Sequence, residues 1–129
     1  QVTGVDASLD GTKLVVCAPA VPCGATALEI AEAAGVTLKP VSEEQKVTDV
    51  RGKVSSGEAD AGIVFATDAK AAGDAVETIA VDPEKKLATR YPMAIVTDAP
   101  HAEAARAFID LVLSDRGQAV LASYGFGTP

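Results

Sequence analysis

Short apolar runs rich in β-branched residues alternate with helix-like stretches along the first two thirds of the chain, and this alternation limits the possible folds. Runs of this length, bounded by Gly, Pro or Asp, are typical of buried strands. The sequence predicts strands over residues 13–18, 38–41, 61–65, 76–81 and 90–96. Because strand and helix alternate, we expect an α/β fold with a mostly parallel sheet flanked by helices.

Three helices are predicted between these strands, over residues 24–34, 49–56 and 68–72. Apolar residues of the first recur at the spacing of one helical face, and Gly35 follows as a C-cap. Thr48 and Thr67 stand where the N-caps of the second and third helices are expected.

The last third of the chain has a different pattern, with two helices predicted over residues 100–113 and 115–124. Phe108, Ile109 and Val112 form one apolar stripe on the first of them. No further strand follows, so these helices need a surface outside this segment to pack against.

Composition excludes several classes of function. The 129 residues carry a net charge of −7, which disfavours a nucleic acid or an anionic membrane surface as partner. With one histidine, a zinc site built on two histidines is impossible. The first residue is Gln1, and we expect either a removed targeting segment or a piece of a longer chain.

No group of residues predicts catalysis, a metal site or a cofactor. His101 stands alone at a predicted helix start, and the chain has no G-x-S-x-G, G-x-G-x-x-G or P-loop motif. Glu43 and Glu44 are the one adjacent acidic pair, and their side chains are expected to point to different sides of a solvated turn. We therefore predict that the chain is not an enzyme.

Two cysteines frame the first strand–helix loop. Cys17 ends a predicted strand and Cys23 begins a helix, a C-x5-C spacing that fits neither a C-x-x-C redox motif nor a zinc half-site. They could form a disulfide or remain two buried thiols. An exported protein favours the disulfide, because oxidising compartments keep such pairs bonded.

The starts of the predicted helices are candidate sites for binding an anion. A helix N-terminus presents unpaired backbone N–H groups and a partial positive charge, so it can bind an anion without Lys or Arg. The chain places such starts at Pro22–Gly24, at Thr48–Val50 and after Phe65, where the strands of a parallel sheet end. Gly24 would let a ligand approach the backbone closely. The alternative is that these are ordinary helix starts that bind nothing.

Five segments together resemble the periplasmic molybdate-binding proteins of ABC transporters. They are Lys13–Gly24, Thr48–Val54, Gly57–Asp68, Tyr91–Val96 and Tyr124–Phe126, in the order of the family. The resemblance implies a type II periplasmic binding protein, in which two α/β lobes close on a tetrahedral oxyanion, here molybdate or tungstate. It implies no cofactor.

The resemblance also assigns ligand contacts by position. It implies that Cys23, with Gly24 beside it, and Val50 meet the anion through backbone N–H groups. Phe65 stands where the family often has tyrosine, so the ring is kept while a hydroxyl donor is lost. That loss costs about 1–3 kcal/mol where the acceptor is left unpaired.

The family further implies how the chain is divided. Residues 1–89 would form most of the second lobe, and residues 90–129 would supply a crossing strand and two helices of the first lobe. The serines of the first lobe would come from sequence before Gln1. The C-terminal helices would then pack on the missing first lobe or on a second copy. An ABC permease would be the membrane partner, and the location would be periplasmic or cell-envelope, with a lipid anchor possible in the full-length protein.

Two other functions fit the same residues. A ligand-sensing regulatory domain can use the same lobe architecture, and a loop disulfide would count against it because cytosolic thiols stay reduced. A thiol enzyme using Cys17 or Cys23 would need a free, reactive thiol. As a partial chain, the molecule could also bind no ligand by itself.

Overall fold

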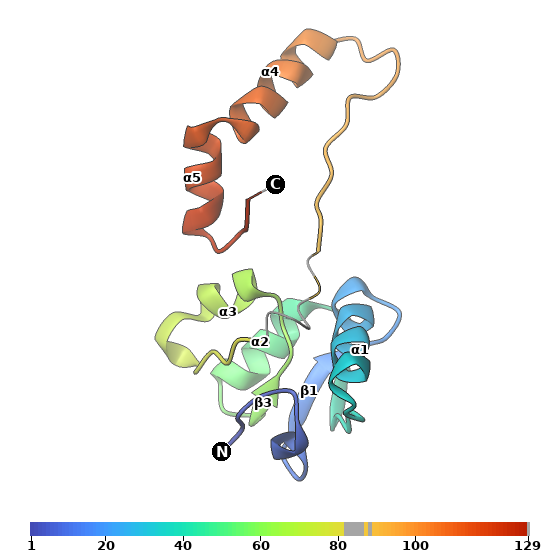
Figure 1. Cartoon of the computed structure of the whole chain (residues 1–129), viewed down its shortest axis with the longest axis vertical. Helices are drawn as coiled ribbons and strands as arrows, with labels where there is room; N and C mark the ends of the chain where they lie inside the picture. The colour runs from blue at the N-terminus through green and yellow to red at the C-terminus, as the bar shows by residue number, and fades with distance from the viewer. Residues whose placement is uncertain (82–86, 88, 129) are drawn as a thin grey trace. The chain divides into compact units, whose positions relative to one another are not determined.

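The computed structural model describes residues 1–81, 87 and 89–128, and it divides the chain into two compact units, Gln1–Leu87 and Ala88–Pro129. The first unit is α/β, as predicted, with helices packed on a parallel sheet (Figure 1). Its elements in chain order are η1 (Ala7–Leu9), β1 (Leu14–Cys17), α1 (Pro22–Ala34), β2 (Ser42–Glu44), α2 (Val47–Ser55), β3 (Ala61–Gly62), α3 (Ala66–Ala72) and η2 (Gly73–Ala75).

The sheet has the order β2-β1-β3, and both outer strands run parallel to β1. Val16 pairs with Glu43 on one side, and Leu14 pairs with Ala61 on the other. All four residues of β1 are buried, as expected for a central strand covered by helices on both faces. The prediction of a mostly parallel sheet is therefore confirmed.

Four predicted strands differ from the structure, and one of them, 61–65, is paired only over Ala61–Gly62. The run 38–41 precedes β2, because Pro40 has no N–H to donate to the ladder and pairing begins only beyond it. Residues 76–81 and 90–96 are not strands, although their apolar patterns predict them. A strand needs a neighbour for its backbone N–H and C=O groups, and neither segment is paired with another among the described residues.

Small side chains let the helices approach the sheet. Ala27 and Ala31 of α1 are buried, and α2 contributes Val50, which is fully inaccessible to solvent. Val50 belongs to a core cluster with Val15 and Cys17 of β1. The core of the first unit therefore lies around the central strand.

The observed cap residues of the helices differ in part from the predicted ones. Gly35 ends α1 in the left-handed conformation (φ 70°) and its N–H donates to Ala31 and Glu32, so that cap is confirmed. The predicted caps Thr48 and Thr67 are wrong, because both lie inside their helices. Each helix begins upstream of its threonine, at carbonyl groups that accept the first helical N–H bonds.

The second unit consists of α4 (Ala102–Leu113) and α5 (Asp115–Ser123), and both predicted helices are confirmed. Ser114 caps α5 by accepting a hydrogen bond from the Gly117 N–H at 3.2 Å. Neither helix contains a buried residue. Among the described residues, no helix combines the length and apolar character needed to cross a bilayer.

A polar triad ties β2 to α2. Lys53 on α2 donates to the Glu44 carboxylate and to the Ser42 hydroxyl, and Ser42 also donates to Glu44. The Glu44 side chain is only 15% exposed. The hydrogen bonds from Lys53 and then from Ser42 lower the pKa of Glu44, and the bond to Glu44 raises the pKa of Lys53.

We predict that Glu44→Gln weakens the dependence of stability on acid pH. A carboxyl whose pKa is lowered by folding stabilises the folded state above its unfolded pKa, and that contribution disappears as the pH falls through the lower, folded value. Urea unfolding of wild type and variant between pH 6 and pH 3 measures this effect. Glu43→Gln, on an exposed neighbour in the same strand, is the matched control. Identical pH profiles for wild type and Glu44→Gln would contradict the prediction.

Candidate functional site

The carboxyl ends of all three strands meet at one edge of the sheet, because the strands are parallel. Helix α1 follows β1, α2 follows β2 and α3 follows β3, so each helix begins near that edge (Figure 1). Ligands of open α/β sheets bind outside the carboxyl ends of the strands. The site predicted from the sequence corresponds to these three helix starts.

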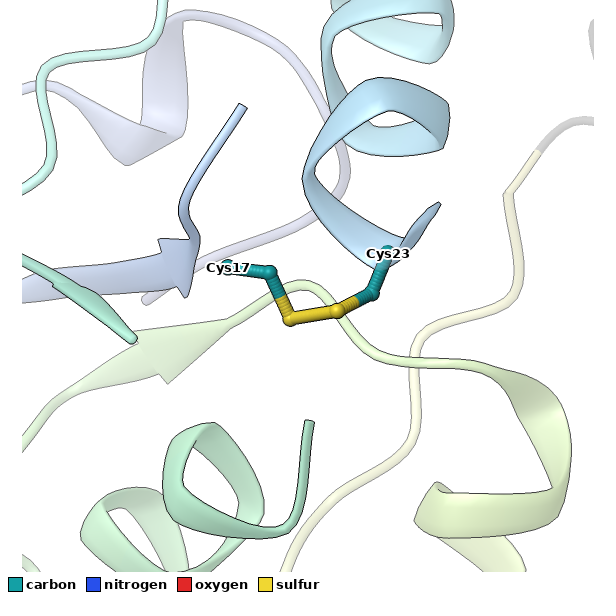
Figure 2. Close-up of a disulfide and its surroundings, with 2 residues drawn as sticks. All are labelled: Cys17 and Cys23. Atoms are coloured by element: carbon teal, nitrogen blue, oxygen red, sulfur yellow. A yellow bond between two sulfur atoms is a disulfide. The ribbon is translucent and has the colours of Figure 1, made fainter. Parts of the chain in front are cut away.

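The loop from β1 to α1 contains a disulfide between Cys17 and Cys23 (Figure 2), with a Cα–Cα distance of 5.6 Å. Of the two alternatives left open by the sequence, the structure has the bonded pair. Cys17 is the last residue of the central strand and is 1% exposed. Cys23 is partly buried in the first turn of α1. The disulfide therefore joins the sheet directly to a helix start.

The first turn of α1 offers one free backbone donor. Val21 is the N-cap and provides no side-chain hydrogen bond, and Pro22 has no N–H. The N–H groups of Gly24 and Ala25 both donate to the Val21 carbonyl, at 3.0 and 3.1 Å. Within the described part of the chain, no acceptor is found for the Cys23 N–H.

Gly24 has a packing role that the sequence did not predict, and its predicted place beside a ligand stays a prediction. A Cβ at this position would lie 2.0 Å from the Ala18 carbonyl oxygen and 2.6 Å from that of Cys17. The position that a Cβ would occupy is therefore filled by the protein's own backbone. Gly24 lets the helix start pack against the end of β1.

The start of α2 provides further donors. The Val50 side chain is in the core, so only its backbone could meet a ligand, as the resemblance implies. Its N–H donates to the Lys46 carbonyl over 3.5 Å, which is long for a backbone hydrogen bond. The N–H groups of Val47 and Thr48, in the first turn, have no acceptor among the described residues. The sequence placed Thr48 at this helix start but gave no role to Val47, because the predicted helix begins at Asp49 and the structural one at Val47.

Phe65 is the N-cap of α3 and its side chain is partly buried. Its carbonyl accepts the N–H bonds of Asp68 and Ala69, at 2.9 and 3.1 Å. The benzyl side chain adds no donor, so any contact with an anion would be by the edge of the ring. The predicted contact between Phe65 and a ligand stays a prediction.

The donors of α1 and α2 are connected through one apolar cluster. Cys23 and Val47 both pack against the core residues that include Cys17 and Val50. The first turn of α1 contains no acidic residue, whereas α2 has Asp49 in its first turn. A carboxylate beside a helix N-terminus competes with a bound anion for the same positive end of the dipole. Helix α1 therefore offers the less hindered of the two N-termini.

Other chemistry has little support in these residues. In the part of the chain that the structure describes, no three residues of the metal-ligating types are grouped to hold a metal ion. Both cysteines are bonded to each other, so neither is a free thiol. His101 is an exposed residue at the start of α4. The donors identified at the helix starts are neutral backbone N–H groups.

A parallel sheet with helix starts at its carboxyl edge defines the class as an open α/β domain of the kind that binds small ligands between strand ends and helices. The family follows from comparison with known proteins. A model of the bacterial extracellular solute-binding proteins matches residues 1–127. The chain belongs to this family.

Within the family, the chain is similar to two molybdate-binding proteins. The chain is 36% identical over 124 residues to the molybdate-binding protein ModA of Mycobacterium tuberculosis and equally to that of Mycobacterium bovis. The matched region covers 96% of this chain and 48% of each relative, so the chain spans about half the length of these proteins. No solved structure matches the chain significantly.

We predict that two glycine substitutions have opposite effects on stability. Gly24→Ala places a Cβ against the Ala18 carbonyl and should lower the free energy of unfolding by about 3 kcal/mol. Gly52→Ala, in the interior of α2 with open space around the site, should raise it by about 1 kcal/mol. Urea unfolding followed by circular dichroism measures both. Equal effects of the two substitutions would show that Gly24 is not packed as described.

Proposed function

We propose that the chain is part of an exported receptor that captures a tetrahedral oxyanion, molybdate or tungstate, for an ABC importer. The observation that carries this proposal is the free Cys23 N–H, at an uncapped helix start on the carboxyl edge of the sheet. Support comes from the solute-binding family and from relatives named for molybdate binding. The chain performs no catalysis in this role.

Backbone N–H groups suit such a ligand. A tetrahedral oxyanion presents several acceptor oxygens, and the N–H groups of Cys23, Val47, Thr48 and Val50 would donate to them. The helix dipoles add partial positive charge without any ammonium group. For this reason the net charge of −7 does not oppose binding. Capture works by stabilising one closed arrangement of the protein over the open ones.

The rest of the receptor would complete the site. Residues 1–89 would serve as the second lobe, and residues 90–129 would return to a first lobe that supplies the remaining donors. The exposed apolar side chains of α4 and α5 support this division, since Phe108 is 61% exposed and Val120 is 53% exposed. A pair of helices without any buried residue has no core of its own.

The location and partners follow from the same proposal. The receptor would work outside the cytoplasm, in the periplasm or the cell envelope, and would deliver its anion to a membrane permease. The Cys17–Cys23 disulfide favours this location, because oxidising compartments preserve such bonds. The same bond counts against the alternative of a cytosolic ligand-sensing domain, and it removes the free thiol that a thiol enzyme requires.

We predict that molybdate shifts the backbone amide signals of Cys23 and of the first turn of α2 in the nuclear magnetic resonance spectrum of the labelled chain. Millimolar molybdate suffices even where half of the donors are missing, because the signals report weak binding. Sodium chloride at equal ionic strength is the control for screening, and sulfate tests selectivity. Amides at these positions that stay unmoved in molybdate would contradict the proposed function.

We also predict that the chain alone self-associates through α4 and α5. Sedimentation equilibrium at tens of micromolar should give a mass above 13.0 kDa for the wild type, and Phe108→Ser should lower it toward the monomer. Arg106→Ser is the matched control, since Arg106 is exposed and lies about 160° around the helix from Phe108. A monomeric wild type would show that this apolar face does not drive association.

A further inference from the structure

Helix α1 lacks the side-chain cap that would ordinarily fix its first turn. Its N-cap is Val21, an apolar residue that is among the poorest at this position. By contrast, α5 is capped by the Ser114 hydroxyl. Something other than a cap must therefore hold the start of α1, and the only covalent link there is the disulfide from Cys17 to Cys23.

We propose that the Cys17–Cys23 disulfide is a positioning element of the anion site, holding the Cys23 N–H in place for the ligand. This inference rests on the proposed function, because it concerns the same donor. It assigns the two sulfur atoms no contact with the anion. Their role is to fix the backbone that makes the contact.

One end of the disulfide is anchored in the central strand and the core of the first unit. Cys17 pairs with Glu44 in the sheet, and the next residue, Ala18, donates its N–H to the Glu44 carbonyl at 2.8 Å. Cys17 is also packed in the core cluster with Val15 and Val50. Cys17 is therefore held by both the sheet and the core, and it fixes the position of one end of the loop.

The other end of the disulfide is held by weaker contacts. Between the cysteines, the loop has one backbone turn bond, from the Val21 N–H to the Ala18 carbonyl at 3.1 Å. Gly24 then packs against that same carbonyl. Both contacts depend on Ala18 and on its placement relative to the helix. Cys23 also packs against the core cluster, but the disulfide is its one covalent bond to the sheet besides the loop backbone.

Removing this bond should loosen the first turn of α1 and leave the rest of the sheet in place. The Cys23 N–H would then sample several orientations, and ordering it again on binding would cost conformational entropy. The disulfide fixes the first turn as a helix cap would, and loss of a cap shifts the equilibrium between the ordered and the frayed first turn by about fivefold. We therefore expect molybdate to bind about fivefold more weakly without the disulfide.

The test compares the wild-type chain with the double variant Cys17→Ala/Cys23→Ala, which keeps the Cys23 backbone N–H. Titration with sodium molybdate, followed at the amide signals of α1 and α2, gives the apparent affinity of each protein. Val16→Ala is the matched control: it removes methyl groups from the same buried strand and leaves the disulfide intact. The double variant should lose about fivefold in affinity, and Val16→Ala should bind as the wild type does.

Amide hydrogen exchange provides a second readout that needs no ligand. The N–H groups of Gly24 and Ala25, which bond to Val21, should exchange faster in the double variant while the amides of β1 keep their protection. Wild type reduced with a water-soluble phosphine should behave like the double variant. In that reduction the phosphine supplies two electrons and becomes its oxide, water supplies the oxygen and two protons, and each sulfur becomes a thiol.

The outcomes separate the two proposals. If the oxidised wild type does not respond to molybdate, the proposed function fails, and the positioning role falls with it whatever the exchange shows. If the wild type binds and the double variant binds equally well, or if the first turn of α1 exchanges at the same rate in both, the positioning role is wrong while the receptor function stands. A loss of affinity that Val16→Ala shares would assign the effect to general destabilisation and also overturn the inference.

Discussion

The parallel pairing of β2 and β3 with β1 is the constraint on which the rest of the first unit depends. Parallel strands require a crossover between each pair, so the helices of this chain return along the sheet and start again at the same edge. The carboxyl edge consequently collects the starts of α1, α2 and α3 (Figure 1). Helices cover both faces of the central strand and bury all four residues of β1. This burial stabilises the arrangement.

The candidate site uses backbone groups where other anion sites use charged side chains. Its free donors arise because Val21 does not cap α1, Pro22 has no N–H, and the first turn of α2 likewise lacks a side-chain cap. Positions that look unfavourable for helix stability therefore leave N–H groups available to a ligand. Without a side-chain cap, the first turn of the helix must be held in place by other contacts. In α1 the disulfide and the close approach of Gly24 to Ala18 provide them.

The sequence predicted the order of the helices and of the first three strands, and it was wrong about the last two strands and about several boundaries, where tertiary contacts decide the outcome. The C-cap Gly35 was found because a left-handed residue after a helical stripe is a local signal. Thr48 and Thr67 were misplaced as caps because the carbonyl groups of Lys46 and Phe65 take the first helical hydrogen bonds, which no local pattern reveals. Likewise, whether an apolar run such as 90–96 becomes a strand depends on a neighbouring strand. At the site, the disulfide was correctly favoured, whereas the packing role of Gly24 required the fold.

The central claim is that backbone N–H groups at the carboxyl edge of this sheet hold a tetrahedral oxyanion. Diffraction from crystals of the chain grown with molybdate, measured at the molybdenum absorption edge, tests it directly, because the anomalous signal locates the metal without reference to the protein. We expect a molybdenum peak close enough to the Cys23 N–H and the first turn of α2 for the oxygens of the anion to accept their hydrogen bonds. A peak elsewhere on the chain, or none at millimolar molybdate, would contradict the claim.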